Sequence, residues 1–125
     1  MGACACKRDS KEQERNMFPN FEGTFKGVKI GVHKKELVTE EVDAIVNGSA
    51  NENLIHNQGV AAAIGRKAGD GMRQESQEWV KNNGQLEPGK VAVTSSGKLE
   101  NLKYILHVIG PVWVDGSKLE TKQLR

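Results

Sequence analysis

Residues 42–51 read Val-Asp-Ala-Ile-Val-Asn-Gly-Ser-Ala-Asn and residues 57–64 read Asn-Gln-Gly-Val-Ala-Ala-Ala-Ile, and these two segments decide the fold. The first is an apolar run that ends in amide side chains, which is typical of a buried strand leading into a loop. The second places Gly59 at the start of a small-residue helix. Strand ends gather ligands in open α/β sheets, and a helix N-terminus offers unpaired N–H groups to an anion. The pattern indicates a pocket for a phosphate-containing ligand.

Strands and helices alternate on either side of this centre. We predict strands over 28–33, 43–47, 91–94 and 104–109. A first helix is predicted over 59–68, and a second one begins after an N-cap at Asp70 and ends before a C′ glycine at Gly84. A third helix is predicted to begin at Ser117. The strand over 43–47 is apolar on both faces, as expected of a strand covered on both sides by helices. In the second helix, four residues share one face and should pack into the core: Met72, Ser76, Trp79 and Val80. The alternation favours an α/β sheet between helical layers.

Composition restricts the classes of function. Hydrophobic residues make up 37% and charged residues 27% of 125 residues, as in a soluble globular domain, and the net charge is +2. Because the basic residues are scattered, we expect no specific nucleic-acid partner. No run approaches the roughly 20 apolar residues of a membrane span, and no apolar signal segment follows the N-terminus. We therefore expect a cytoplasmic or nuclear protein, or both.

Residues 1–20 are predicted to be a disordered polar leader, with order beginning at Phe21. Gly2, Cys4 and Cys6 allow a weaker alternative, N-myristoylation with nearby palmitoylation, although Cys6 stands where the pattern wants Ser or Thr. The two cysteines have no partners at zinc-ligand spacing, and we expect no metal site.

Several ordered blocks resemble the macrodomain family, the ADP-ribose-binding fold. They are the strand over 43–47 leading to Asn51, the loop at 59–60, the pair at 68–69 and the strand over 104–113. The blocks at 74–76 and 89–94 are more similar to macrodomains of ADP-ribosyltransferase proteins and viral replicases than to those of histone variants. The resemblance implies a three-layer α/β/α sandwich with a mixed sheet. It also implies that residues 21–125 are the N-terminal portion of the domain, with the C-terminal part missing.

The resemblance implies a ligand site that consists of Glu36, Leu37, Asn51, Asn57, Gln58, Gly59 and Val60. Glu36 would accept from the adenine amino group, or else it is a solvated loop carboxylate. Asn51 would hold the distal ribose, although three residues rather than two separate it from Asn47. Gly59 would let the backbone approach the phosphate, whereas Asn57 and Gln58 replace two glycines of the family's loop.

The resemblance implies a module that binds ADP-ribose or mono-ADP-ribosylated proteins and uses no cofactor. The alternatives are an ADP-ribosyl-protein hydrolase, in which Asn51 would be catalytic, and a truncated scaffold that binds nothing. Ala61 stands where a family of hydrolases carries its carboxylate base, and the broken glycine triplet weakens the other hydrolytic route. His107 is predicted to be a satisfied core residue, whereas His56 either orients the ligand loop or is a surface residue.

Overall fold

The computed structural model describes residues 21–48, 50–111 and 114–116. The chain, predicted as one domain from residue 21 onward, divides into two compact units, residues 1–36 and residues 37–125. The leader with Gly2, Cys4 and Cys6 and the helix predicted from Ser117 lie outside the described residues.

The described part of the first unit is a β-hairpin. Strands β1 (Phe21–Phe25) and β2 (Val28–Val32) pair antiparallel, with Phe21 opposite Val32 and Phe25 opposite Val28. The two turn residues, Lys26 and Gly27, have φ of 47° and 80°, which is the left-handed pair that matches the twist of a tight hairpin. The predicted strand over 28–33 is confirmed except for its last residue.

The second unit contains the 3₁₀ helix η1 (Leu37–Thr39), strands β3 (Ala44–Asn47), β4 (Ala92–Ser95) and β5 (Tyr104–His107), and helices α2 (Gly59–Ala68) and α3 (Asp70–Asn83). The two helices and three strands that we predicted here are confirmed within two residues at each end. The strand expected to reach residue 109 ends at His107 because the ladders to both of its neighbours end there.

The predicted N-cap at Asp70 is wrong. Gly69, with φ of 81°, is both the C-cap of α2 and the N-cap of α3, so Asp70 is the first residue of α3. A single residue that joins two helices must leave the helical conformation, and glycine does so without steric cost. Gly84 is the C-cap of α3, one position from the predicted C′.

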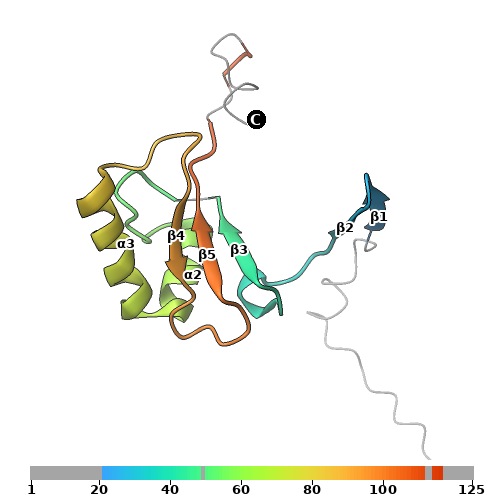
Figure 1. Cartoon of the computed structure of the whole chain (residues 1–125), viewed down its shortest axis with the longest axis horizontal. Helices are drawn as coiled ribbons and strands as arrows, with labels where there is room; N and C mark the ends of the chain where they lie inside the picture. The colour runs from blue at the N-terminus through green and yellow to red at the C-terminus, as the bar shows by residue number, and fades with distance from the viewer. Residues whose placement is uncertain (1–20, 49, 112–113, 117–125) are drawn as a thin grey trace, which may run out of the picture. The chain divides into compact units, whose positions relative to one another are not determined.

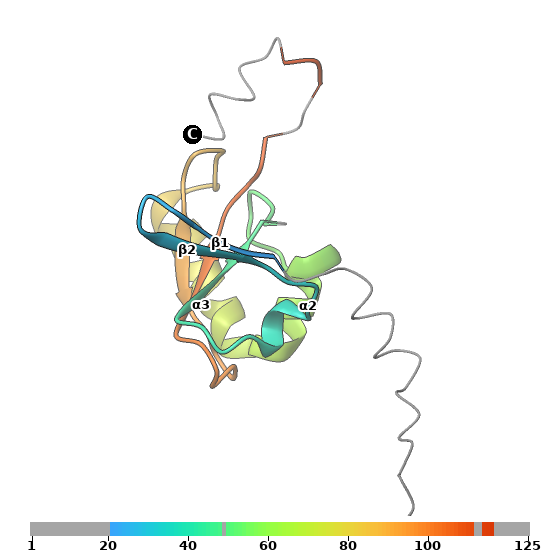
Figure 2. The same ribbon diagram turned by 90° about the vertical axis from the view of Figure 1, so that its right-hand side faces the viewer.

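The sheet of the second unit is mixed and has the order β3-β5-β4, with β3 parallel and β4 antiparallel to the central β5 (Figure 1). Helix α2 lies behind the strands in this view. The contact between α2 and α3 can be followed in Figure 2. The α/β class and the mixed sheet are confirmed.

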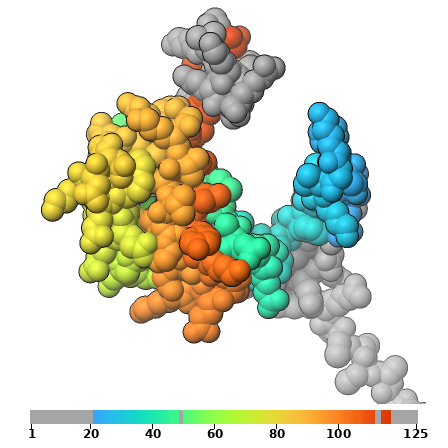
Figure 3. All heavy atoms as spheres, viewed as in Figure 1, coloured from blue at the N-terminus to red at the C-terminus, as the bar shows by residue number. Residues whose placement is uncertain are grey.

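Side chains alternate along all three strands between a helix-covered face and an open face. The helix-covered face carries Ile45, Asn47, Ala92, Thr94, Ile105 and His107, which are all buried. The open face carries Val46, Val93 and Tyr104, which are 53%, 51% and 53% exposed. It is the face turned toward the viewer in Figure 3. In the part of the chain that the structure describes, β3 is thus packed on one side and not, as predicted, on both.

Two apolar clusters make up the core. The first joins η1 and α2 to the centre of the sheet, through Val38, Ile45, Ile64, Ala68, Met72, Leu99, Leu102 and Ile105. The second packs the loop after β3 against the segment before β4, through Ala50, Leu54, Leu86 and Ala92, with Trp79, Val80 and Ile109 beside them. The second cluster therefore supports the loop that carries the predicted site.

Candidate functional site

The loop between β3 and α2 is held by the side chain of Asn51. Its Nδ2 donates to the carbonyl oxygen of Ile55 at 3.0 Å, and its Oδ1 accepts from the Ile55 N–H at 2.8 Å. Leu54, which is buried in the same turn, has a left-handed φ of 51°, an uncommon conformation for a residue with a side chain. Asn51 therefore shapes the loop. Its amide group still has the chemical capacity for a further donated and a further accepted hydrogen bond.

The N-terminus of α2 follows this loop. Gln58 is the N-cap residue, in an extended conformation, and its side chain makes no capping hydrogen bond within the described residues. The first turn contains no acidic side chain, and residues 57–60 are exposed. Gly59 has a φ of 54°, which favours glycine. A ten-residue helix whose N-cap side chain accepts from none of its first N–H groups suits an anion.

A cavity of about 570 Å³ lies beside Asn51. Its other walls are Glu52, residues 85–88, which precede β4, and Ile109, which follows β5. The cavity is thus at the C-terminal ends of the parallel strands β3 and β5, and its volume is within the range of small-molecule sites. Of the predicted ligand residues, Asn51 is the one that lines it, whereas residues 57–60 are not part of its wall.

Buried polar side chains connect the loop to all three strands. His107 Nδ1 lies 3.0 Å from Asn47 Nδ2, and His107 Nε2 lies 2.9 Å from Thr94 Oγ1. His56, the residue before the exposed segment 57–60, places its Nε2 3.0 Å from Ser76 Oγ of α3. The two imidazole rings contact each other, with centroids 4.9 Å apart. The prediction that His107 is a satisfied core residue is confirmed, and His56 is buried rather than on the surface.

Burial keeps both imidazoles neutral at physiological pH. Desolvation, assisted by the nearby Arg73, lowers the pKa of His56. Desolvation and then the neighbouring His56 lower the pKa of His107 to about 4. Neither ring is therefore poised as a general acid or base at neutral pH, and their role is structural.

Glu36, predicted to bind adenine, and Leu37, its neighbour in the predicted ligand site, lie in different units. Glu36 is exposed at the end of the first unit, and Leu37 begins η1 in the second, where it packs against the first core cluster. The structure thus connects Asn51 with 57–60 through one short loop. The adenine-binding role of Glu36 and the ligand-binding role of Leu37 stay predictions.

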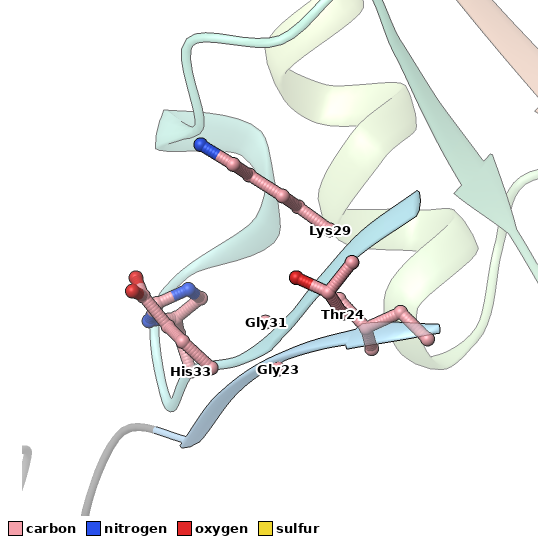
Figure 4. Close-up of a pocket in the computed structure, with 7 residues that line it drawn as sticks. Gly23, Thr24, Lys29, Gly31 and His33 are labelled. Atoms are coloured by element: carbon pink, nitrogen blue, oxygen red, sulfur yellow. The ribbon is translucent and has the colours of Figure 1, made fainter. Parts of the chain in front are cut away.

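The hairpin carries a hollow of about 440 Å³, shown in Figure 4. Thr24, Lys29 and His33 stand around it, and each of them is exposed. Its walls are the surface of a two-stranded ribbon, so it lacks the enclosed apolar lining of a ligand pocket, and we assign no site there.

Sequence reasoning missed the link between α3 and the end of β4. Glu75 accepts from the Ser95 N–H at 2.8 Å and from the Ser95 hydroxyl through its other carboxylate oxygen. It also missed the roles of Asn47 and Thr94, for which the one available signal is that they alternate in step with the buried Ile45 and Ala92.

Among the described residues, no three His, Cys, Asp or Glu side chains converge as a metal site would require. The helices of the same residues also lack the length and apolar content needed to cross a membrane.

Comparison with known proteins places these features in context. The sequence profile of the Macro domain family matches residues 46–125. An uncharacterized protein of Thermotoga maritima is 47% identical over 100 residues, which cover 80% of this chain and 16% of that protein. The mouse protein mono-ADP-ribosyltransferase PARP9 is 37% identical over 87 residues, which cover 70% of this chain and 10% of that protein.

The Oceanobacillus iheyensis macrodomain with ADP is a structural neighbour. It has a TM-score of 0.76 and 27% sequence identity, over 85% of this chain and 56% of that one. The chain therefore spans little more than half the length of this macrodomain and a small part of the two longer proteins.

Proposed function

The chain belongs to the macrodomain family, and on this basis we propose that it is a binding module for ADP-ribose and for mono-ADP-ribosyl groups on proteins. One arrangement carries the proposal: the Asn51 loop and the uncapped N-terminus of α2 follow directly from the end of β3. The likeness to the Oceanobacillus iheyensis macrodomain with ADP supports the same class of ligand.

The chemistry of these groups matches the parts of the ligand. The N–H groups at the start of α2 would bind a diphosphate, because the helix dipole favours negative charge there. Asn51 would donate to and accept from ribose hydroxyls with the capacity that its bonds to Ile55 leave unused. Neither step needs a metal ion or a cofactor.

We favour binding without hydrolysis. Ala61, the position at which a carboxylate base would stand, is apolar and only 2% exposed. The segment between Asn53 and Asp70 contains no carboxylate in the sequence. Asn57 and Gln58 place side chains where a water-positioning glycine loop would keep bare backbone. Turnover of a mono-ADP-ribosylated protein by this chain would support the hydrolase instead.

Val60 offers the sharpest test, because its exposed side chain lies in the first turn of α2. Val60→Glu adds a carboxylate that the helix dipole favours but that repels a bound phosphate, so folding should be retained while affinity falls. Val60→Gln is the uncharged control of the same length. We expect ADP-ribose affinity by titration calorimetry to fall about tenfold or more in Val60→Glu and to change less than about threefold in Val60→Gln.

Adenosine, which has no phosphate, should bind both Val60 variants equally. Equal loss of ADP-ribose affinity in both variants would show that no phosphate binds at the α2 N-terminus. Absence of any ADP-ribose binding by the parent would contradict the proposed function. Asn51→Ala is a poorer test, since it also removes both hydrogen bonds that shape the loop.

A further inference from the structure

Five buried polar side chains form one continuous group between the ligand loop and the strands. They are Asn47 of β3, Thr94 of β4, His107 of β5, Ser76 of α3 and His56 of the loop, and none is more than 3% exposed. The hydrogen bonds among them determine where each imidazole carries its proton, because each neighbour has a limited number of hydrogens to donate.

His107 carries its proton on Nε2. Asn47 Nδ2 can only donate, so His107 Nδ1, 3.0 Å away, accepts and is unprotonated. His107 Nε2–H then donates to Thr94 Oγ1 at 2.9 Å, and the Thr94 hydroxyl donates onward to the Ser95 carbonyl oxygen at 3.1 Å. A second proton on His107 would make Nδ1 a donor as well. Nδ1–H would then face the N–H of Asn47, and the hydrogen bond to Asn47 would be lost.

His56 also carries its proton on Nε2. The single hydroxyl hydrogen of Ser76 donates to the Met72 carbonyl oxygen at 2.9 Å, so Ser76 Oγ accepts from His56 Nε2–H at 3.0 Å. His56 Nδ1 is buried and has no hydrogen-bond partner within the described residues. A second proton would have to occupy this nitrogen without an acceptor, which is costly in a buried site.

The charged groups that face the pair also oppose protonation. Arg73 of α3 opposes protonation of His56, and His56 opposes protonation of His107 across the 4.9 Å ring contact. Further contacts come from Asn47, Thr94, Ser76 and Gly65 of α2, which lies close to the His56 Cβ, and none of these titrates. No carboxylate among these neighbours would stabilise an imidazolium.

The geometry points to His56 and His107 as positioning residues that hold the ligand loop only while both rings are neutral, so that acidification releases the loop and weakens ligand binding. This inference rests on the proposed function. His56 lies between the Asn51–Ile55 hydrogen bonds and the N-terminus of α2, so its displacement from Ser76 would disturb both parts of the site.

The direction of the pH effect follows from the pKa values. The pKa of each ring in the folded chain lies below the ordinary value of 6.5, and that of His107 is about 4. Above pH 6.5 both rings are neutral in folded and unfolded chain alike, and their contribution to stability is fully present. As the pH falls from there toward 4, the unfolded or locally opened chain binds protons that the folded chain excludes, so stability is lost.

The first experiment measures ADP-ribose affinity at about pH 7.5 and about pH 5.5, across which the ordinary histidine titrates. We expect the affinity of the parent to fall by up to about tenfold for each ring that opening exposes, because acidification raises the ratio of open to closed loop and only the closed fraction binds. His56→Gln keeps a donor for Ser76 but cannot titrate, and its affinity should change much less. His33→Gln replaces an exposed histidine of the hairpin and should behave as the parent does.

The second experiment needs no ligand. Ring-nitrogen NMR of the parent at about pH 7.5 should show Nδ1 unprotonated and Nε2 protonated in both histidines. Amide exchange of Ile55 and Asn57, corrected for its intrinsic pH dependence, should accelerate on acidification before that of α3. The opposite tautomers, or the same pH dependence of affinity in the parent and His56→Gln, would overturn the inference. If ADP-ribose binds at no pH, the proposed function fails, and the NMR and exchange data still decide this inference.

Discussion

The two faces of the β3-β5-β4 sheet are built from the same strands but differ in what holds them. On the helix-covered face, Ile105 is fully buried under the helices and His107 is fully hydrogen-bonded. On the open face, Val46, Val93 and Tyr104 are about half exposed. Adjacent residues of one strand therefore differ in how much they contribute to the free energy of unfolding. The site depends on the helix-covered face.

The open face is unusual for strands of this kind. Parallel strands are generally buried on both faces, and β3 is parallel to β5. Apolar side chains that stand together on a surface favour association with another apolar surface. Stability within this unit must therefore come mainly from the helix-covered face.

The largest expected difference in the free energy of unfolding is between substitutions at two neighbouring residues of the central strand β5. Ile105→Ala removes a fully buried side chain from the first core cluster and should lower the free energy of unfolding by about 2–5 kcal/mol. Leu106→Ala, one residue on and on the opposite, half-buried side, should cost clearly less. Urea unfolding of both variants measures the difference, and equal losses would show that the open face is packed in solution.

An intermediate difference is expected for two isosteric exchanges on β4. Thr94→Val removes the acceptor for His107 Nε2–H and leaves a buried donor without a partner, which should cost about 1–3 kcal/mol. Val93→Thr makes the reverse exchange on the exposed side and should stay within about 0.5 kcal/mol. Thermal unfolding measures both, and a neutral Thr94→Val would exclude Thr94 from the His107 network.

The smallest effect on stability is expected on the open face itself. Combining Val46→Thr with Val93→Thr keeps the β-branched shape, so the free energy of unfolding should change by less than about 1 kcal/mol. Any concentration-dependent self-association of the parent, measured by sedimentation velocity, should decrease because the apolar patch is smaller. Unchanged self-association in the double variant would show that the copies contact each other through a surface other than the open face.

Local patterns in the sequence were enough to predict the helices. The small apolar residues at helical spacing in 59–68 and the stripe through Met72 and Ser76 gave both helices of the sheet's covered face. Their junction was mispredicted at Asp70 because glycine is a weak N-cap signal, and nothing nearby in sequence shows that Gly69 ends one helix and begins the next.

The interior of the site could not be predicted in the same way. Asn47 and His107 are 60 residues apart in the chain, and their hydrogen bond depends on the register of a parallel pair that sequence periodicity does not determine. The amide of Asn51 was assigned to a ribose from the resemblance alone, whereas its bonds to Ile55 are a local turn that other loop sequences could form. The ligand-binding roles of Glu36, Leu37 and residues 57–60 stay predictions.

The parallel pairing of β3 with β5 also determines the order in which the unit can be completed during synthesis. β5 is the last of the three strands in the chain and the central one in the sheet. On a ribosome, α2 and α3 emerge while β3 has no strand to pair with, and β4 and β5 can then form a hairpin from neighbouring segments. Closing the long loop back to β3 comes last, and we expect this step to limit the folding rate. Until then the apolar side chains of β3 are an aggregation hazard for the nascent chain.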